Sequence, residues 1–307
     1  MNPTDKETYL FVMEIERFAI HDGPGIRTVV FLQGCPLRCA WCSNPESHTI
    51  HPRLLHLAHK CTGCGCCART CPADCITMQN GMPTFDRNRC RACRACAESC
   101  LQEAIRFTGE KMSVSDIMNV IIRDREYYIS SGGGLTFSGG EAFTQFDGLM
   151  KLLLRARQED IPVAIETSGQ VLQENLRRAY PLIHLFLFDM KHPDKYLLKK
   201  YTGADYDTIL SNLTWIAEQN PAKVIARIPI IPGFNYDMHT IRELFLLLSE
   251  RRIRQVHLLP YHTLGENKYR QLGLSCLYPS HRMLTKEDLL PLKDMGEGIG
   301  LRIWIGG

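Results

Sequence analysis

The chain has 307 residues, of which 45% are hydrophobic and 22% charged, and its formal net charge is +3. This length fits one large domain or two ordinary ones, with the composition of a globular protein. The weak positive charge argues against a nucleic-acid-binding protein, which usually carries a strongly basic surface. No apolar run approaches the roughly 20 residues that cross a bilayer, and residues 1–18 lack the pattern of a secretory signal. We therefore expect a cytoplasmic protein that binds neither nucleic acid nor membrane.

Short apolar runs alternate with helix-like patterns along the chain outside residues 59–105. The apolar runs are almost continuous, which is typical of strands in a parallel sheet covered by helices. Repeated strand–helix units predict an α/β protein, either a β/α barrel or an open doubly wound sheet. The first helix is expected to begin at Ser113, because Asp116 follows three residues later as in a capping box. The expected strands lie at residues 27–34, 134–140, 161–169, 183–191, 223–231, 255–262 and 301–306, and the expected helices at 113–121, 146–158, 206–219 and 238–252.

Polar and cysteine residues come directly after several of these apolar runs. In both architectures the ligand-binding and reacting groups lie at the carboxyl ends of the strands. The residues that we therefore expect on one common face are Cys35, Ser138–Glu141, Glu166–Gly169, Asp189–Lys191 and His262.

Cysteines are unusually frequent: the chain has 14, and thirteen of them lie between Cys35 and Cys100. Without a secretory signal, this density indicates metal binding rather than disulfides. Residues 61–71 and 90–100 share the spacing C-x2-C-x2-C-x3-C, which is that of bacterial two-cluster ferredoxins. In that spacing the fourth cysteine of each run binds the other cluster. The expected ligands are Cys61, Cys64, Cys67 and Cys100 for one [4Fe-4S] cluster, and Cys71, Cys90, Cys93 and Cys96 for the other.

Three further cysteines fall outside these two ligand sets. Cys66 and Cys75 align with Ala95 and Ala104 of the other half of the repeat, so we expect both to be small buried apolar residues. Cys276 stands alone near the C-terminus and is expected to be inert. The alternative for the whole insert is a pair of zinc sites, but the crossing pattern of eight cysteines favours clusters.

Cys35, Cys39 and Cys42 have a different spacing, C-x3-C-x2-C, and no fourth cysteine close by that is not already assigned. A cubane cluster has four irons and usually takes four thiolates. Three thiolates leave one iron open to an external ligand, as in catalytic metal sites that keep one position vacant. The alternative interpretation is a structural zinc site.

At these residues the sequence resembles the radical S-adenosylmethionine (SAM) enzymes, whose C-x3-C-x2-C signature has an aromatic residue before the last cysteine, here Trp41. The resemblance implies that Cys35, Cys39 and Cys42 hold the catalytic cluster. It also implies that SAM binds the open iron and is cleaved to a 5′-deoxyadenosyl radical. Residues 139–141, Gly-Gly-Glu, match the family motif that holds the SAM ammonium group, and glycines allow a backbone to approach a ligand closely.

Four longer segments, residues 21–47, 131–143, 188–192 and 258–269, resemble the activating enzymes of glycyl radical enzymes, the pyruvate formate-lyase activase group. The resemblance runs over nearly the whole chain, and the cysteine-rich insert is like that of the longer members. It implies that the chain removes a hydrogen atom from the Cα of one glycine in a partner glycyl radical enzyme. The reducing electron is expected from a flavodoxin or a ferredoxin.

The same resemblance implies a set of residues around SAM. Asp189 and Lys191 match an Asp-x-Lys motif that contacts the SAM carboxylate and ribose region, and His262 matches a Pro-Tyr-His motif that contacts SAM. Arg227 stands among apolar residues and needs an anionic partner, either a carboxylate of SAM or substrate or a structural ion pair. The full set expected to bind SAM is Trp41, Cys42, Ser43, Gly139, Gly140, Glu141, Thr167, Asp189, Met190, Lys191, Arg227 and His262.

Two further positions carry implications about a cation and about the partner. Glu166 stands where shorter activases have an aspartate that can help to hold a monovalent cation, and the change to glutamate leaves cation binding open. Asp22 and Gly23 belong to an Asp-Gly-Pro-Gly loop that resembles the family loop near the bound glycine peptide. Pro-Gly also marks ordinary turns, which is the alternative reading of this loop.

These features together predict a partial (β/α)6 barrel of the radical SAM type with an inserted ferredoxin-like domain. Residues 1–58 and 106–307 are expected to form the barrel, and residues 59–105 the insert with its two [4Fe-4S] clusters. An incomplete barrel would have a lateral opening for the glycine loop of the partner. The expected cofactors are three [4Fe-4S] clusters and SAM, and the expected oligomeric state is a monomer.

Two other functions compete with this one. The first is another radical SAM maturase with auxiliary clusters, although such clusters usually lie toward the C-terminus. The second is a non-catalytic electron-transfer iron–sulfur protein, which would need neither the Cys35–Cys42 site nor the Gly-Gly-Glu turn. The sequence does not identify the partner glycyl radical enzyme. The residues that form either a solvated face or a surface for an acidic electron donor are Arg87, Arg89, Arg91 and Arg94.

Overall fold

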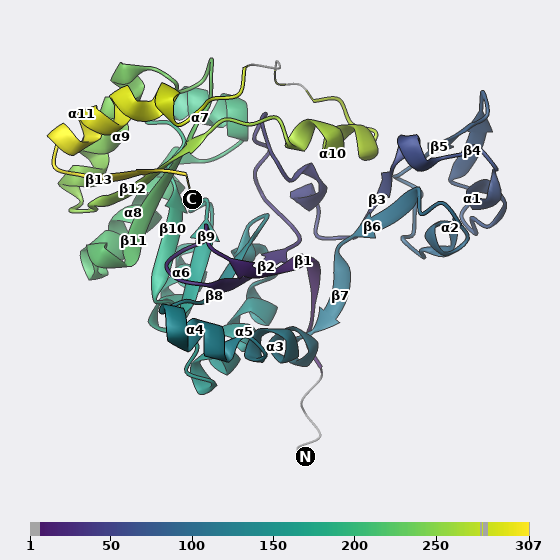
Figure 1. The fold of residues 1–307 in the computed structure, drawn as a ribbon, viewed down its shortest axis with the longest axis horizontal. Helices are drawn as coiled ribbons and strands as arrows, with labels where there is room; N and C mark the ends of the chain where they lie inside the picture. Colours follow the sequence, from purple (N-terminus) through teal and green to yellow (C-terminus); the bar gives the residue numbers. More distant parts are fainter. Residues whose placement is uncertain (1–6, 277, 279–281, 307) are drawn as a thin grey trace.

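A nine-stranded sheet forms the centre of the molecule (Figure 1). The computed structural model describes residues 7–276, 278 and 282–306. Its strands follow the linear order β13-β12-β11-β10-β9-β8-β2-β1-β7, so β13 and β7 are the two ends of the sheet. Neighbouring strands from β13 to β2 are parallel. These parallel strands are β2 (Arg27–Leu32), β8 (Gly134–Gly139), β9 (Val163–Thr167), β10 (Leu185–Asp189), β11 (Val224–Ile230), β12 (Gln255–Pro260) and β13 (Arg302–Ile305).

Each of the seven apolar runs singled out in the sequence contains one of these parallel strands, which confirms the α/β prediction and its mostly parallel sheet. The run at residues 301–306 extends the sheet as β13, which pairs with β12. The sequence did not predict the two antiparallel strands at the other end, β1 (Tyr9–Ala19) and β7 (Glu110–Ser113). Strand β1 alternates between buried and exposed residues and changes register twice against β2, so it lacks the continuous apolar signal of the parallel strands.

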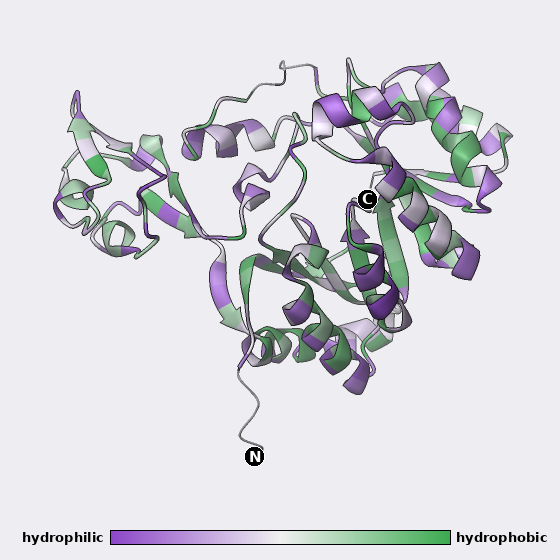
Figure 2. Ribbon diagram, turned by 180° about the vertical axis from the view of Figure 1, so that it is seen from behind, coloured by the Kyte–Doolittle hydropathy of each residue, from purple (hydrophilic) through white to green (hydrophobic). Residues whose placement is uncertain are grey.

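Helices surround the sheet and turn their hydrophobic faces toward it (Figure 2). The Ser113 hydroxyl accepts a hydrogen bond from the Asp116 backbone N–H at 3.0 Å, which confirms the predicted start of α3. The longer helices are α3 (Val114–Ile122), α4 (Arg125–Ser131), α5 (Phe146–Gln158), α6 (Gln173–Ala179), α7 (Lys195–Thr202), α8 (Tyr206–Gln219), α9 (Met238–Glu250), α10 (Gly265–Gln271) and α11 (Leu290–Gly298). The short 3-10 turns are η1 (Pro45–His48), η2 (Ala58–Lys60), η3 (Ala142–Gln145), η4 (Tyr180–Leu182), η5 (Pro221–Lys223) and η6 (Glu287–Leu289).

The main hydrophobic core lies between the sheet and these helices. Its largest side chains include Phe137, Phe186, Phe188 and Phe245, each 0% exposed. Full burial of one such side chain contributes about 1.5–3 kcal/mol to folding. The core therefore holds the carboxyl ends of the parallel strands in fixed positions. None of the described helices is long and apolar enough to cross a membrane.

The cysteine-rich insert forms a lobe that projects to one side of the sheet (Figure 1). Strands β3 (Arg53–His56) and β6 (Ile105–Thr108) pair with each other at its base, and β4 (Ile76–Gln79) pairs with β5 (Met82–Phe85) at its far side. Two one-turn helices, α1 (Cys66–Arg69) and α2 (Ala95–Glu98), complete the lobe. The lobe has a small core of its own, made of Leu54, Cys67, Cys75, Ile76, Cys96 and Ile105.

The two halves of the lobe repeat the same local structure. Helix α2 lies 29 residues after α1, and the hydroxyls of Thr70 and Ser99, which are also 29 residues apart, lie within hydrogen-bonding distance at 3.1 Å. Left-handed backbone conformations recur at the same interval, in the pairs Gly63 and Ala92, Gly65 and Arg94, and Asp74 and Glu103. Two halves with one backbone geometry match the repeat of the cysteine spacing.

Candidate active site

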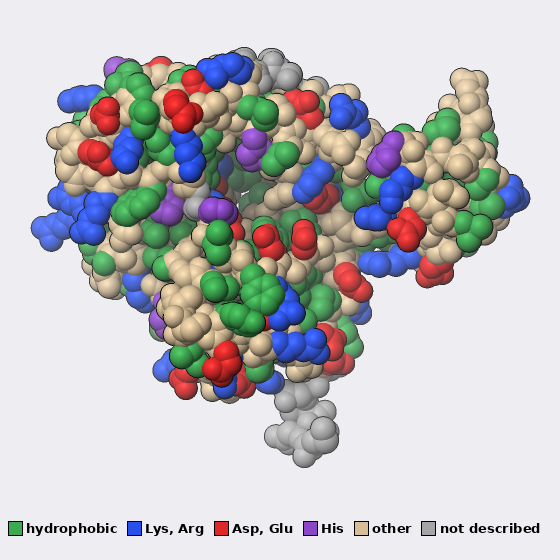
Figure 3. Space-filling model, viewed as in Figure 1, with side chains coloured by type: hydrophobic (Ala, Val, Ile, Leu, Met, Phe, Trp, Pro, Cys, Tyr) green, Lys and Arg blue, Asp and Glu red, His purple; other side chains and the backbone are tan. Residues whose placement is uncertain are grey.

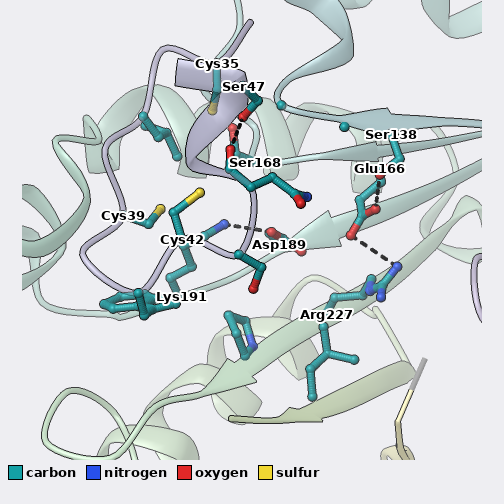
Figure 4. Close-up of a pocket in the computed structure, with 18 of the residues that line it drawn as sticks. Cys35, Cys39, Cys42, Ser47, Ser138, Glu166, Ser168, Asp189, Lys191 and Arg227 are labelled. Atoms are coloured by element: carbon teal, nitrogen blue, oxygen red, sulfur yellow. Dashed lines mark hydrogen bonds and ion pairs between the residues drawn. The ribbon is translucent and has the colours of Figure 1, made fainter. Parts of the chain in front are cut away.

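A cavity of about 440 Å³ opens at the carboxyl ends of the parallel strands (Figure 4). Pockets for small-molecule cofactors typically measure about 300–1,000 Å³. Each of the end-of-strand segments expected on one face contributes at least one residue to its lining: Cys35, Ser138 to Gly140, Glu166 to Ser168, Asp189, Lys191 and His262. The parallel strands thus bring together residues that lie far apart in the sequence.

Cys35, Cys39 and Cys42 line one side of this cavity on the loop that follows β2. Burial raises the pKa of the Cys35 thiol to about 12, and it raises the pKa values of Cys39 and Cys42 as well. Three half-buried thiols in one cavity are thus difficult to ionise by themselves. An iron–sulfur cluster binds the deprotonated form and offsets that cost. These three residues therefore fit an iron–sulfur cluster.

Gly139 and Gly140 allow β8 to lie directly against the cysteine loop. A Cβ atom at Gly140 would collide with the Gly34 carbonyl, and one at Gly139 would collide with the Leu32 carbonyl. Gly139 also has a φ of +113°, a backbone conformation that residues other than glycine rarely adopt. Both glycines line the cavity, so the backbone there is open to a ligand.

Glu141 makes contacts within the protein that the sequence did not predict. Its carboxylate accepts hydrogen bonds from the Thr167 hydroxyl at 2.9 Å and from the backbone N–H and hydroxyl of Ser168 at 2.8 and 2.6 Å. The residue is 1% exposed, and burial raises the pKa of its carboxyl. Glu141 therefore fastens the end of β9 to the turn after β8, and its side chain is not among those that line the cavity.

A buried ion pair crosses the floor of the cavity (Figure 4). Arg227 Nη1 on β11 lies 3.2 Å from Glu166 Oε1 on β9 and 3.9 Å from Asp22 Oδ1. The Ser138 hydroxyl donates a short hydrogen bond to Glu166 Oε2. Arg227 Nε is buried and has no hydrogen-bond partner within the described chain. The guanidinium thus has carboxylate neighbours and still offers a free donor.

Asp189 and Lys191 form the second charged pair of the cavity. Lys191 Nζ donates a hydrogen bond to Asp189 Oδ2 at 2.7 Å, and the lysine is 8% exposed. Burial alone would lower the pKa of Lys191, but the carboxylate of Asp189 helps to raise it above its usual range, so the ammonium stays charged. Asp189 Oδ1 is buried without a hydrogen-bond partner among the described residues, and it is free to accept one from a ligand.

Three other predicted SAM contacts, Trp41, Ser43 and His262, also line the cavity. Trp41 packs against Phe234 with ring centroids 4.5 Å apart. Burial lowers the pKa of His262, which favours its neutral form. Met190 has a different location: it is 2% exposed and lies in the hydrophobic core, and it is not among the lining residues.

The sequence did not predict two sets of contacts that fix residues lining the cavity. Lys268 on α10 donates hydrogen bonds to Asn44 Oδ1 at 2.7 Å and to Glu46 Oε1 at 2.6 Å. The Asn235 amide donates hydrogen bonds to the Lys191 and Pro229 carbonyls, both at 2.8 Å. The local sequence gives no signal for the lysine contact, but a buried asparagine after an apolar strand is a usable sign of a fixed turn.

The lobe contains two smaller cavities lined by cysteines. Within the described parts of the chain, no group of three His, Cys, Asp or Glu side chains is placed to hold a single metal ion. A [4Fe-4S] cluster is a larger object, with one thiolate on each of its four irons. One cavity is lined by Cys61, Cys64, Cys66, Cys67 and Cys100, and the other by Cys71, Cys75, Cys90, Cys93 and Cys96. In each cavity the fourth cysteine of one run meets the first three of the other, and Cys66 or Cys75 is a fifth thiol.

Residues 29–245 match the radical SAM superfamily. The indoleacetate decarboxylase activating enzyme of Tractidigestivibacter scatoligenes is 37% identical, over 98% of this chain and 99% of the relative. The choline trimethylamine-lyase activating enzyme of Oleidesulfovibrio alaskensis is 37% identical, over 92% of this chain and 93% of the relative. Among solved structures, Streptococcus suis SuiB bound to its precursor peptide has a TM-score of 0.53 at 14% identity, covering 93% of this chain and 49% of SuiB, which bears on the fold alone.

The parallel sheet, the cavity with its three thiols and the match over most of the chain agree with one another. A radical SAM domain implies a [4Fe-4S] cluster and SAM as cofactors. Because several relatives at 33–39% identity carry the same kind of name, the subfamily is shown as well as the superfamily. The chain is an enzyme that belongs to the radical SAM superfamily and, within it, to the activating enzymes of glycyl radical enzymes.

Proposed function

We propose that this chain activates a partner glycyl radical enzyme by removing a hydrogen atom from one glycine Cα. The observation that carries the proposal is the cavity in which three half-buried thiols face two charged pairs at the carboxyl ends of the sheet. With its cofactors bound, the [4Fe-4S] cluster supplies the electron that cleaves SAM to methionine and the 5′-deoxyadenosyl radical. The protein contributes binding, orientation and the exclusion of competing reactions.

The side chains of the cavity supply complementary charges for SAM. Cys35, Cys39 and Cys42 would hold the cluster and would leave it one position open to SAM. Lys191 attracts the carboxylate, and the unpartnered Asp189 Oδ1 accepts a hydrogen bond from the ribose. Arg227 donates a hydrogen bond from its free Nε to the far side of the bound SAM. Trp41, Ser43, Thr167 and His262 shape the remaining wall.

Glu141 acts on SAM indirectly in this proposal. Its three hydrogen bonds fix residues 167–168, whereas the glycines before it, 139 and 140, approach the ligand through their backbone. Met190 takes part through its backbone only, because its N–H donates to the Arg227 carbonyl at 2.8 Å and so links β10 to β11.

We infer that Arg227 and Lys191 supply the positive charge that a monovalent cation supplies in shorter activases. Both carboxylates of that position, Glu166 and Asp189, already have a cationic neighbour at 3.2 and 2.7 Å. SAM cleavage by this chain is then independent of sodium and potassium. To test this, SAM binding and cleavage are measured in buffer in which tetramethylammonium replaces sodium and potassium. A loss of SAM affinity that added potassium restores would contradict the inference.

In our proposal, residues 59–105, which make up most of the lobe, form a ferredoxin-like domain with two [4Fe-4S] clusters, and residues 1–58 and 106–307 form the barrel. The two cysteine-lined cavities support the crossed ligand sets, Cys61, Cys64, Cys67 and Cys100 for one cluster and Cys71, Cys90, Cys93 and Cys96 for the other. Cys66 and Cys75 are then spare thiols beside them.

The lobe receives electrons from a flavodoxin or ferredoxin in this scheme. Arg87 is not available to such a donor, because its guanidinium donates to the Gln271 carbonyl at 3.1 Å. Arg89 also donates to a carbonyl, that of Ala73 at 3.1 Å, but Arg89 and Arg91 are exposed whereas Arg87 is half-buried, so these two remain candidates for attracting an acidic protein. Reduction of the lobe clusters by flavodoxin should therefore slow in high salt. Equal rates in low and high salt would refute this role.

The experiment that tests the proposed function uses the anaerobically reconstituted chain with dithionite, SAM and candidate glycyl radical enzymes, which are sought first among the genes next to its own. We expect 5′-deoxyadenosine and a glycyl radical signal in electron paramagnetic resonance (EPR). Formation of 5′-deoxyadenosine without a glycyl radical on any of the candidate partner enzymes would favour a different radical SAM function.

A further inference from the structure

An exposed aromatic patch lies at the end of β1, outside the cavity. Phe18 and Tyr127 stack edge to face with their ring centroids 4.9 Å apart, and they are 47% and 46% exposed. Ile20, two residues after Phe18, is 65% exposed. Figure 3 shows hydrophobic side chains gathered on this face below the central hollow, over β1 and α4. We call Phe18, Ile20 and Tyr127 the aromatic patch.

The backbone holds Phe18 outward at an energetic cost. Phe18 has φ of +63°, a conformation that bulky residues rarely adopt, and β1 has a register shift against β2 between Glu16 and Ala19. Bulges of this kind redirect side chains and are frequent beside active sites. Backbone strain that the surrounding structure maintains is concentrated at functional positions. A large apolar side chain at a strained, exposed position therefore points to an interaction.

The patch is connected to the cavity through the loop that follows it in the chain. The chain runs from Ile20 directly into the loop of Asp22, whose carbonyl accepts a hydrogen bond from the Thr136 hydroxyl at 2.7 Å. The Asp22 carboxylate lies 3.9 Å from Arg227 on the cavity floor. A macromolecule that approaches Arg227 along the Asp22 loop would therefore also contact the patch.

Charge indicates what kind of surface would fit. Glu14 and Glu16 are exposed on the same strand as Phe18, and neither has an ion-pair partner among the described residues. Arg17, between Glu16 and Phe18, is paired with Asp124, and its guanidinium lies 4.9 Å from the centre of the Phe18 ring, so it does not neutralise the two glutamates. A partner surface with an apolar side chain flanked by lysine or arginine would complement this arrangement.

We propose that the aromatic patch is the docking surface for the glycyl radical enzyme, at the surface that surrounds its glycine loop. This inference rests on the proposed function and adds the contact that guides the partner to the cavity. A second copy of this chain is the competing occupant, because exposed aromatic side chains also mark dimer interfaces.

The test replaces Phe18 by Asn, a residue that tolerates positive φ, so this variant should fold as well as the wild type. Leu154→Ser on α5 is the matched control, because Leu154 is 48% exposed and lies on a helix behind the sheet. The first assay measures 5′-deoxyadenosine formation with dithionite and SAM alone. The second measures glycyl radical formation at increasing concentrations of the partner glycyl radical enzyme. Sedimentation of each variant alone reports its oligomeric state.

Phe18→Asn should leave SAM cleavage without partner and the melting temperature unchanged, and raise the apparent KM for the partner about tenfold or more. Leu154→Ser should match the wild type in every assay. An unchanged KM for Phe18→Asn would refute the docking surface, and so would a wild-type dimer that this substitution dissociates. If the wild type forms no glycyl radical at all, the proposed function fails first, and that outcome is distinct from the other two.

Discussion

The sheet and the cysteine-rich lobe are stabilised in different ways. The sheet is surrounded by a core of fully buried aliphatic and aromatic side chains, and this core reaches every parallel strand. The core of the lobe consists of six buried residues, of which Cys67, Cys75 and Cys96 are three. A unit of this size rarely folds on apolar burial alone and usually needs disulfides or metals. The sheet should therefore hold its shape without iron, and the lobe should not.

The sheet and the lobe also differ in their cysteine sites: the cavity at the sheet is open to a reactant, and the two cavities of the lobe are not. The cavity at the sheet offers three cysteines and leaves room for SAM, whereas each lobe cavity offers at least four cysteines in a much smaller space. A fully ligated cluster has no place for a substrate, and a cluster with three protein ligands does. In our account, reaction occurs only where the stable part of the fold leaves an iron open.

The largest expected effect is the loss of catalysis after replacement of one cavity cysteine. Cys39→Ala removes one of three ligands, so SAM cleavage should fall below detection. Iron content should drop from about twelve to about eight per chain if the lobe keeps both clusters. Anaerobic iron analysis and 5′-deoxyadenosine assays measure both. Cys276→Ala is the matched control, and it should behave like the wild type.

Replacement of a lobe cysteine should have a local effect on structure. Cys96→Ala removes a proposed cluster ligand and a core side chain, so the lobe should open and become sensitive to proteases. Limited proteolysis should then cut within residues 59–105 and leave the sheet intact. A variant whose lobe resists cleavage and whose iron content equals that of the wild type would show that Cys96 is not a ligand.

The buried ion pair of the cavity should matter for stability. Removing one partner from a fully buried pair costs about 3–5 kcal/mol, and we expect the lower end for Arg227→Met because the Glu166 side chain is 25% exposed. Loss of the arginine also lets burial raise the pKa of Glu166 further, since Arg227 is the main group that lowers it. Denaturant unfolding measures the change in the free energy of unfolding.

A second variant separates the charge effect from packing. Arg227→Met combined with Glu166→Gln removes both charges, so it should regain most of the lost stability while SAM affinity stays low. Equal stability of the single and double variants would indicate that packing of the arginine chain, and not its charge, supports the fold.

The smallest expected effect is the dependence of stability on pH, and it arises from a residue of the sheet. Burial lowers the pKa of His257 on β12 from 6.5 to about 4. Between these values the unfolded chain binds a proton that the folded chain does not, so stability should fall as pH drops below about 6.5. In His257→Gln the loss between about pH 7.5 and about pH 5.5 should be smaller. An identical loss in both proteins would show that His257 is not responsible.

The sequence predicted the cavity well because its residues follow buried parallel strands. Such strands are continuously apolar, and their carboxyl ends meet at one edge, so Cys35, Asp189 and His262 could be placed together without coordinates. Strand β1 was not predicted, because its alternating pattern and its bulge at Glu16–Ala19 give a weak signal. The aromatic patch was missed for the same reason.

The sequence did not predict contacts between side chains that lie far apart along the chain. The Glu141 carboxylate binds residues 167–168, and Lys268 reaches Glu46 across more than two hundred residues. Such pairs depend on how separate loops meet in space, and nothing in the local sequence indicates them. Arg227 was an intermediate case: burial of a charge predicted an anionic partner, and only the fold identified Glu166.

Mössbauer spectroscopy of the chain reconstituted with iron-57 tests the central contrast between one open and two closed clusters most directly. The account predicts about twelve irons in three [4Fe-4S] clusters, and a change at one iron site alone when SAM is added. The same addition should change no site in Cys39→Ala. A wild-type spectrum that SAM leaves unchanged, or one in which SAM alters the lobe clusters, would contradict it.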